Sequence, residues 1–304
     1  MRLARYDGGK IGLVVDGGVV DVSDIAGAAT GASAENWPDT APLRLIRDFE
    51  KLRPSLEGAM RERAPVPLDQ VRLETPVPWP NKVIAYPVNY HAHGKEMGAN
   101  YRAKNQGFFL KPSSSVSGPN DPVELPNVPG REVHHEAELG IIIGKECRDL
   151  PRERWHEAVF GYACLLDMVV RGREERVFRK AYDTFCPVGP WIVTADEVEH
   201  PDALSMKLWV NGELRQAANT RDLVLDIPGM IATASAVMTL YPGDIIATGT
   251  PEGVGPVQDG DTIRIVIEGV GEMNVPVVQG SRGMTEVFAE PYVPPIVKQE
   301  LTAK

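Results

Sequence analysis

Two glutamates two positions apart, Glu136 and Glu138, stand in the segment HHEAELGIIIG at residues 134–144. On a β-strand, side chains at this spacing point to the same face, so the two carboxylates would lie side by side. The apolar run 139–143 follows directly and carries the pair toward a core. Burying both is costly unless a positive charge lies between them. A hard divalent cation would meet this requirement. A motif this short nevertheless favours, by itself, a solvated strand edge with two surface glutamates.

Two histidines, His134 and His135, precede this pair. Imidazole ligands would suit zinc or iron better than a hard cation. Because adjacent residues of a strand face opposite ways, only His134 can share the face of the glutamates. We expect both histidines to lie outside the metal shell and to serve as ordinary hydrogen-bonding residues.

The candidate for a third ligand is Asp167, the one charged residue in the apolar segment GYACLLDMVV at residues 161–170. An unpaired carboxylate in such surroundings is costly. Arg171 lies four residues further on and could form an ion pair with it on a helix. Asp167 is therefore predicted to be either a metal ligand or the partner of Arg171.

A candidate general base lies in the segment NYHAHGKE at residues 89–96. His93 and Glu96 are three residues apart, so on a helical turn they share a face and the carboxylate can orient the imidazole. Such a histidine can activate water. By itself, however, this spacing is more typical of an ordinary surface pair.

Two Pro- and Gly-rich segments are typical of loops that contact a substrate. KAYDTFCPVGPW at residues 180–191 begins with Lys180, and DIIATGTPEGVGP at residues 244–256 places Thr250 in a glycine-rich turn. Backbone N–H groups and hydroxyls in such a turn can hold an oxyanion. The second segment is not a P-loop, because no lysine follows the glycines at the required spacing. Each segment by itself is also compatible with ordinary turn chemistry.

The elements that must position these residues are mostly strands. Short apolar runs bounded by turn residues predict strands at 83–85, 139–143, 206–210, 245–246 and 263–267. Asn211-Gly212 predicts a two-residue hairpin. Helices are expected at 152–160, 171–180 and 228–240. This pattern favours a mainly β fold with short helices (α+β), with rolled or sandwiched sheets.

The first 75 residues are expected to form a small α+β domain. They offer a hairpin at 11–22 and a helix from Leu43 that Pro54 should end or kink. Five prolines within 65–80 predict a linker without regular elements. The predicted organisation is an N-terminal domain at 1–75, a catalytic domain at 76–284 and a C-terminal arm at 285–304.

Composition excludes several classes of partner. The net charge of −10 argues against nucleic acid, which requires clustered lysine and arginine. No apolar run approaches the roughly 20 residues that span a bilayer, so no membrane association is expected. Three widely spaced cysteines indicate reduced thiols, and a cytoplasmic location is expected.

Taken together and in order, these segments resemble the fumarylacetoacetate hydrolase family over about residues 80–280, in particular its longer bacterial-type members with a small N-terminal domain. The matching segments are NYHAHGKE, FFLKPSSSVSGP, HEAELGIIIGK, GYACLLD with the following arginine, KAYDTFCPVGPW, RQAANT and GDIIATGTPEGVG. An ordered set of this kind is far more specific than any single motif.

The resemblance implies a β-rich catalytic domain, a homodimer, and a bound magnesium or manganese ion, with calcium as a further candidate. The implied metal ligands are Glu136, Glu138 and Asp167. The implied catalytic residues are the dyad His93 and Glu96, together with Lys180 beside the metal. The implied substrate contacts are Tyr90, Arg171, Glu174 and Thr250.

The activity implied is metal-dependent hydrolysis of a carbon–carbon bond in a 2,4-dioxo acid such as fumarylpyruvate. Decarboxylation of a 2-oxo acid or isomerisation of a hydroxydiene acid could use the same residues, and a non-catalytic metal-binding protein is the alternative of another class. Glu174 stands where the family commonly has glutamine. It would repel an anionic substrate unless it is protonated or paired with Arg173 or Arg176.

Overall fold

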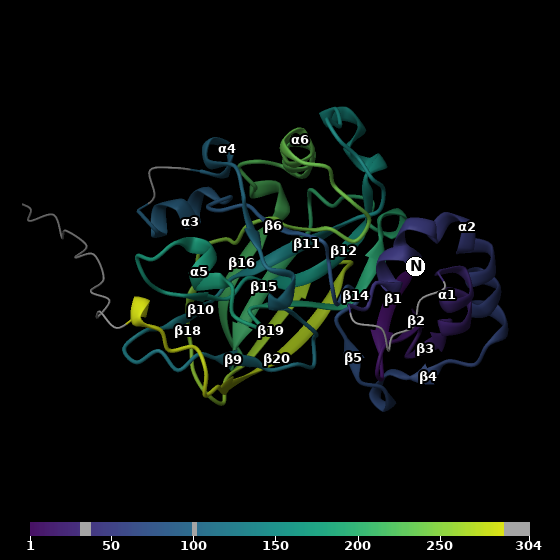
Figure 1. Ribbon diagram of the computed structural model, residues 1–304, viewed down its shortest axis with the longest axis horizontal. Coiled ribbons are helices and arrows are strands. Elements are labelled where there is room, and N and C mark those ends of the chain that lie inside the picture. The colour runs from purple at the N-terminus through teal and green to yellow at the C-terminus, as the bar shows by residue number, and fades with distance from the viewer. Residues whose placement is uncertain (31–37, 99–101, 289–304) are drawn as a thin grey trace, which may run out of the picture.

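The computed structural model describes residues 1–30, 38–98 and 102–288. In Figure 1 the N-terminal strands and two helices lie at one side of a larger body of strands, with short helices at its periphery. The predicted mainly β fold with short helices is confirmed. No helix in these described ranges combines the length and the apolarity that crossing a bilayer requires.

A 12-stranded sheet runs through the whole molecule. Its strands follow the order β4 (Val66–Pro67), β3 (Gly18–Asp21), β2 (Lys10–Val15), β1 (Arg2–Tyr6), β14 (Cys186–Thr194), β12 (Val159–Leu166), β11 (Ala137–Ile143), β17 (Ile245–Ala247), β6 (Val83–Ala85) and β7 (Phe109–Lys111). Off this path, β5 (Leu73–Glu74) pairs with β1 and β8 (Val116–Ser117) pairs with β14. Every residue of the central strand β11 is buried, which explains its unbroken apolar run.

A second sheet packs against the first. Its five strands follow the order β16 (Glu213–Asn219), β15 (Ser205–Val210), β19 (Thr262–Ile267), β20 (Gly271–Gln279) and β9 (Val123–Leu125). Alternate residues of β19 are buried, and β12 and β14 contact β20 across the interface. The two sheets therefore form a sandwich around one core. Asn211-Gly212 closes the β15–β16 hairpin, as predicted.

A third, three-stranded sheet lies beside the sandwich and leads into the candidate site. It consists of β13 (Val169–Val170), β10 (Val133–His135) and β18 (Gly255–Val257). Because β10 continues almost directly into β11, and β12 almost directly into β13, the chain passes from one sheet to another at Glu136 and at Asp167.

The N-terminal part is built from the β1–β2–β3 meander and the helices α1 (Ser23–Thr30) and α2 (Ala41–Glu62). Pro54, which is predicted to end or kink its helix, does not end it, since α2 continues to Glu62. Apolar side chains on both sides of the proline, among them Phe49 and Leu56, are buried against the sheet and hold the helix together.

The proline-rich stretch 65–80 is also more regular than predicted. It contains the short strands β4 and β5, which pair with β3 and β1. Pro67 is tolerated because β4 is an edge strand. Since β1 pairs with β14, the N-terminal strands extend the main sheet. The division into domains at residues 75 and 76 stays a prediction, and residues 289–304 of the predicted C-terminal arm lie outside the described residues.

Short helices complete the fold. The α-helices after the N-terminal part are α3 (His91–Glu96), α4 (Ala103–Gln106), α5 (Arg176–Lys180) and α6 (Ile227–Val237). The 3-10 helices are η1 (Leu68–Gln70), η2 (Ser113–Ser115), η3 (Arg152–Glu157), η4 (Ala195–Glu197), η5 (Thr220–Asp222) and η6 (Glu286–Phe288).

The three predicted helices of the main domain differ in outcome. The one at 228–240 is confirmed as α6, whose N-terminus is capped by the side chain of Asp226. The predicted helix at 152–160 is the shorter 3-10 helix η3. The predicted helix at 171–180 is limited to α5, because the chain before it is held in β13 and the Arg171 N–H still bonds to the Glu132 carbonyl.

Close packing of β12 against β14 gives a testable prediction. A Cβ atom at Gly161 would lie 2.2 Å from the Val193 carbonyl oxygen. Gly161→Ala should therefore lower the free energy of unfolding by about 1–3 kcal/mol, measured by chemical denaturation. Gly58→Ala in α2 is the matched control, because nothing lies within 4 Å of the added Cβ. It should raise stability by about 0.5–1 kcal/mol. Equal stability of Gly161→Ala and the parent would contradict the packing.

Candidate metal centre and active site

Three carboxylates meet where the chain passes between the sheets. Glu136 lies between β10 and β11, Glu138 lies in β11, and Asp167 directly follows β12. The antiparallel pairing of β11 with β12, continued by a 2.9 Å hydrogen bond from the Asp167 N–H to the Glu136 carbonyl, sets Asp167 beside the glutamates. One carboxylate oxygen of each residue lies within 4.8 Å of the others, and all three side chains are buried.

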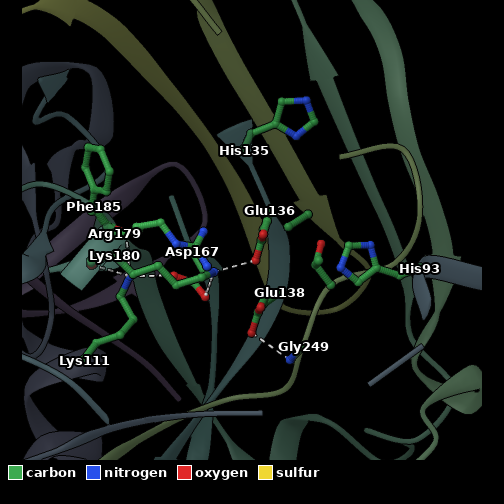
Figure 2. A network of polar contacts seen from close by, with 12 residues as sticks. His93, Lys111, His135, Glu136, Glu138, Asp167, Arg179, Lys180, Phe185 and Gly249 are labelled. Atoms are coloured by element: carbon green, nitrogen blue, oxygen red, sulfur yellow. Dashed lines mark hydrogen bonds and ion pairs between the residues drawn. The ribbon is translucent and has the colours of Figure 1, made fainter. Parts of the chain in front are cut away.

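Two buried lysines form ion pairs with carboxylates of this cluster (Figure 2). Lys180 Nζ donates to Glu136 Oε2 at 2.7 Å and to Asp167 Oδ2 at 2.5 Å. Lys111 Nζ donates to Asp167 Oδ1 at 2.5 Å and to the backbone carbonyls of Lys180 and Phe185. Asp167 thus pairs with lysines and not with Arg171, the partner that helical spacing offered. Lys111 was missed at the sequence level, although it lies in the matching segment FFLKPSSSVSGP.

The charges in the cluster do not balance. Burial raises the pKa of Glu138 well above its usual value, and the carboxylates of Asp167 and Glu136 raise it further. Burial acts to raise the pKa of Glu136, but the Lys180 ammonium and other positive groups nearby together lower it to about 2. Three carboxyl groups therefore face two ammonium groups, and Glu138 is the one whose ionised form neither lysine compensates. A divalent cation with oxygen ligands fits this donor set.

A histidine–glutamate pair borders the same space. In α3, His93 Nδ1 lies 3.0 Å from Glu96 Oε2, and Glu96 Oε1 accepts a 2.9 Å hydrogen bond from the Gly253 N–H. Although burial acts to raise the pKa of Glu96, its hydrogen bonds to His93 and Gly253 lower it overall. The ionised Glu96 accepts from Nδ1–H, which leaves Nε2 of His93 able to take up a proton. Figure 2 shows His93 and Lys180 on opposite sides of the two glutamates.

These groups line one cavity of about 380 Å³, which contains all three carboxylates, His93 and Lys180. Thr250 and Arg171 also line it, together with Arg176 and Arg179. A larger hollow of about 680 Å³, bordered by residues 125–133 and β18, contains none of the carboxylate cluster. The smaller cavity is therefore the candidate active site, because it is where titratable groups with shifted pKa values converge.

Two of the predicted substrate contacts do not line this cavity. Glu174 does not line it and forms an ion pair with Arg131 at 2.8 Å. Tyr90 is buried, and its hydroxyl has no hydrogen-bond partner among the described residues. Glu174 therefore does not repel an anion from the cavity wall, because its charge is neutralised elsewhere.

The two histidines before the glutamates make other contacts. His134 Nε2 lies 2.9 Å from Glu132 Oε2, and His135 Nδ1 lies 3.3 Å from Gln216 Oε1. Gln216 was not identified from the sequence as a functional residue. The signal was its place in the matching segment RQAANT.

The family model described as the fumarylacetoacetate (FAA) hydrolase C-terminal domain matches residues 82–278. Because this span covers well over half of the chain, the chain belongs to the fumarylacetoacetate hydrolase family. The family expected from the ordered segments is thereby confirmed.

Three relatives place the chain within this family. Maleylpyruvate hydrolase of Aquipseudomonas alcaligenes is 41% identical over 286 residues, which cover 90% of this chain and 98% of the relative. The crystal structure of maleylpyruvate hydrolase from Sphingobium sp. SYK-6 in complex with manganese(II) and pyruvate is 69% identical, with a TM-score of 0.84, and covers 92% of this chain and 100% of that one. The crystal structure of 5-carboxymethyl-2-hydroxymuconate delta-isomerase from Mycobacterium smegmatis is 35% identical, with a TM-score of 0.70. This match covers 92% of this chain and 100% of that one.

Proposed function

We propose that this chain is a metal-dependent hydrolase of acylpyruvates, the 2,4-dioxo acids to which maleylpyruvate belongs. The observation that carries the proposal is one cavity in which a buried carboxylate triad faces a carboxylate-oriented histidine. The likeness to two maleylpyruvate hydrolases supports it, since one of them holds manganese and pyruvate.

The metal ligands in this proposal are Glu136, Glu138 and Asp167, and the ion is magnesium or manganese, with calcium accepting the same oxygen ligands. When bound, the ion supplies Lewis-acid polarisation of the substrate's oxygens. The Gly249 N–H donates to Glu138 Oε2 at 2.7 Å and fixes the orientation of that carboxylate. Lys111 and Lys180 hold Asp167 from both of its oxygens.

His93 is the proposed general base. Its Nε2 takes a proton from a water molecule while the water oxygen bonds to the distal carbonyl carbon of the substrate. The bond between that carbon and C3 then breaks, and its electron pair remains on the pyruvyl fragment. A proton returns to C3, so the products are a carboxylic acid and pyruvate. Glu96 keeps the imidazole oriented throughout, because its other oxygen is anchored by the Gly253 N–H.

The cavity wall suits an anionic substrate. Lys180 has a raised pKa because the charges of Asp167 and Glu136 outweigh the effect of burial, so it stays protonated and can stabilise developing negative charge. Arg171 and Arg179 line the same cavity, and neither forms an ion pair with a carboxylate in the part of the chain that the structure describes. Thr250 offers a hydroxyl for the carboxylate of the substrate.

Other reactions could use the same groups. An isomerase needs a proton shuttle and no attacking water, and the likeness to a muconate delta-isomerase keeps this as the second candidate. A decarboxylase would release carbon dioxide from a 2-oxo acid. A non-catalytic metal-binding protein would have no use for a base, and the His93–Glu96 pair argues against it.

Turnover in water enriched in oxygen-18 distinguishes the hydrolase from the isomerase and the decarboxylase. With maleylpyruvate or fumarylpyruvate and manganese, the proposal predicts pyruvate and an acid whose new carboxylate carries one solvent oxygen, measured by mass spectrometry. An isomerase would return a product of unchanged mass, and a decarboxylase would release carbon dioxide. A manganese-loaded protein that converts neither the 2,4-dioxo acids nor oxaloacetate would contradict the proposal.

The proposal includes a homodimer and a cytoplasmic location. The first rests on the resemblance to the family. The second is supported by Cys147, Cys164 and Cys186, which are free thiols.

A further inference from the structure

The buried side chain of Gln216 links β10, β11 and the turn 249–253 by hydrogen bonds. It lies in β16, is 1% exposed, and packs under the turn 249–253. This turn approaches β16 so closely that a Cβ at Gly253 would lie 1.9 Å from the Arg215 carbonyl oxygen. With φ of +90° as well, position 253 requires glycine. The backbone of the turn therefore rests directly on β16, where Gln216 can reach it.

The amide of Gln216 makes four hydrogen bonds, and backbone groups fix its orientation. Oε1 accepts from the Ala137 N–H at 3.0 Å and from His135 Nδ1 at 3.3 Å. Nε2 donates to Thr250 Oγ1 at 2.8 Å and to the Pro251 carbonyl at 2.9 Å. A backbone N–H can only donate and a carbonyl can only accept, so the amide cannot be turned the other way.

This orientation decides where the Thr250 hydroxyl points. Because Thr250 Oγ1 accepts a hydrogen from Gln216, its own hydrogen must go to another acceptor. No described protein group accepts it, and Thr250 lines the cavity that holds the carboxylate triad. The Thr250 hydroxyl is thus set as a donor into the cavity. The same amide accepts a hydrogen bond from the backbone N–H of Ala137, the residue between Glu136 and Glu138.

We propose that Gln216 is a positioning residue that directs the Thr250 hydroxyl hydrogen at the carboxylate of a bound 2-oxo acid. The inference rests on the proposed function, in which Thr250 meets that carboxylate. Ordinary packing would require only that the Gln216 side chain fill its space. Positioning requires in addition that it donate to Thr250.

Gln216→Glu tests this difference. It keeps the shape of the side chain but replaces the donating NH2 group with an oxygen that can only accept. A carboxylate can still accept from Ala137 and His135, but it can donate neither to the Pro251 carbonyl nor to Thr250. The Thr250 hydrogen then turns to the carboxylate and away from the cavity. The KM for an acylpyruvate and the dissociation constant of pyruvate on the manganese-loaded protein should both rise about tenfold or more. The kcat should change much less, and manganese binding should be retained.

A double-mutant cycle shows whether Gln216 acts through Thr250. In the Thr250→Val background, Gln216→Glu should cause little further loss of pyruvate affinity. The isosteric Gln216→Met should weaken pyruvate binding less than Gln216→Glu, since it frees the hydroxyl without turning it away. Gln279→Glu adds the same charge outside this cavity and should leave pyruvate affinity unchanged. Melting of each metal-free variant reports on folding alone.

The inference is overturned if Gln216→Glu costs the same pyruvate affinity in the parent and in the Thr250→Val background. It is also overturned if Gln216→Met weakens pyruvate binding more than Gln216→Glu does. If Gln216→Glu does not fold, the cycle of Gln216→Met with Thr250→Val decides, and additive losses overturn the inference. The proposed function fails separately, when the parent binds pyruvate yet hydrolyses no 2,4-dioxo acid. A manganese-loaded parent that does not bind pyruvate overturns the inference itself.

Discussion

The His93→Gln variant should lose about two to four powers of ten in kcat with maleylpyruvate, because general-base catalysis contributes that much and an amide cannot take up a proton. Gln keeps roughly the size of the imidazole and a polar atom near Glu96. Since His93 lines the cavity but is not one of the three clustered carboxylates, manganese affinity should stay unchanged, as measured by calorimetry.

Glu96→Gln is the matched variant for this prediction. It leaves Nε2 of His93 in place and removes the charge that orients and stabilises the imidazolium. Its kcat should therefore fall less than that of His93→Gln. A His93→Gln enzyme with the kcat of the parent would remove the histidine from the mechanism. A parallel loss of manganese affinity would show instead that the substitution had disturbed the carboxylate cluster.

The second large effect is expected for Asp167→Asn. Loss of a metal ligand should weaken manganese binding by at least about 100-fold, more than changes to groups that only support the ligands. Asp167 also pairs with both Lys111 and Lys180. Removing the charge between two buried ammonium groups should lower the stability of the metal-free protein by about 3–5 kcal/mol. Isothermal titration with manganese and denaturation of the metal-free protein measure the two effects.

Glu138→Gln separates metal binding from structural charge. Glu138 forms no ion pair with either lysine, and its pKa is raised by burial and by the neighbouring carboxylates Asp167 and Glu136. Manganese affinity should fall as it does in Asp167→Asn. The metal-free protein should nevertheless keep or gain stability, because one of three repelling carboxylates is gone. A metal-free Glu138→Gln protein as unstable as Asp167→Asn would contradict this account of the charges.

Local patterns predicted much of the fold. The apolar runs of β6, β11, β15, β17 and β19 and the turn at Asn211-Gly212 follow from side-chain periodicity and turn chemistry, which act over a few residues. The errors lie where tertiary contacts overrule a local preference. Burial on both sides of Pro54 carries α2 through the proline, and pairing with β3 and β1 orders the proline-rich stretch after it.

The candidate site divides in the same way. Glu136, Glu138 and Asp167 could be proposed as ligands because paired carboxylates beside apolar runs are costly without a cation. His93 and Glu96 could be paired because three residues span one helical turn. Lys111 and Gln216 lie in segments that match the family, but local spacing gave neither a role, because their partners lie 56 and 34 residues away in the chain.

The sequence by itself determined the chemistry available to this protein: three carboxylates, a histidine with its glutamate, and the family to which their order belongs. Tertiary structure decided which charges oppose each other. It gave Asp167 two lysines in place of Arg171, turned Glu174 to Arg131 and left Glu138 uncompensated. The physical reason is that charge balance and hydrogen-bond direction depend on distance through space, which sheet pairing sets and sequence separation does not.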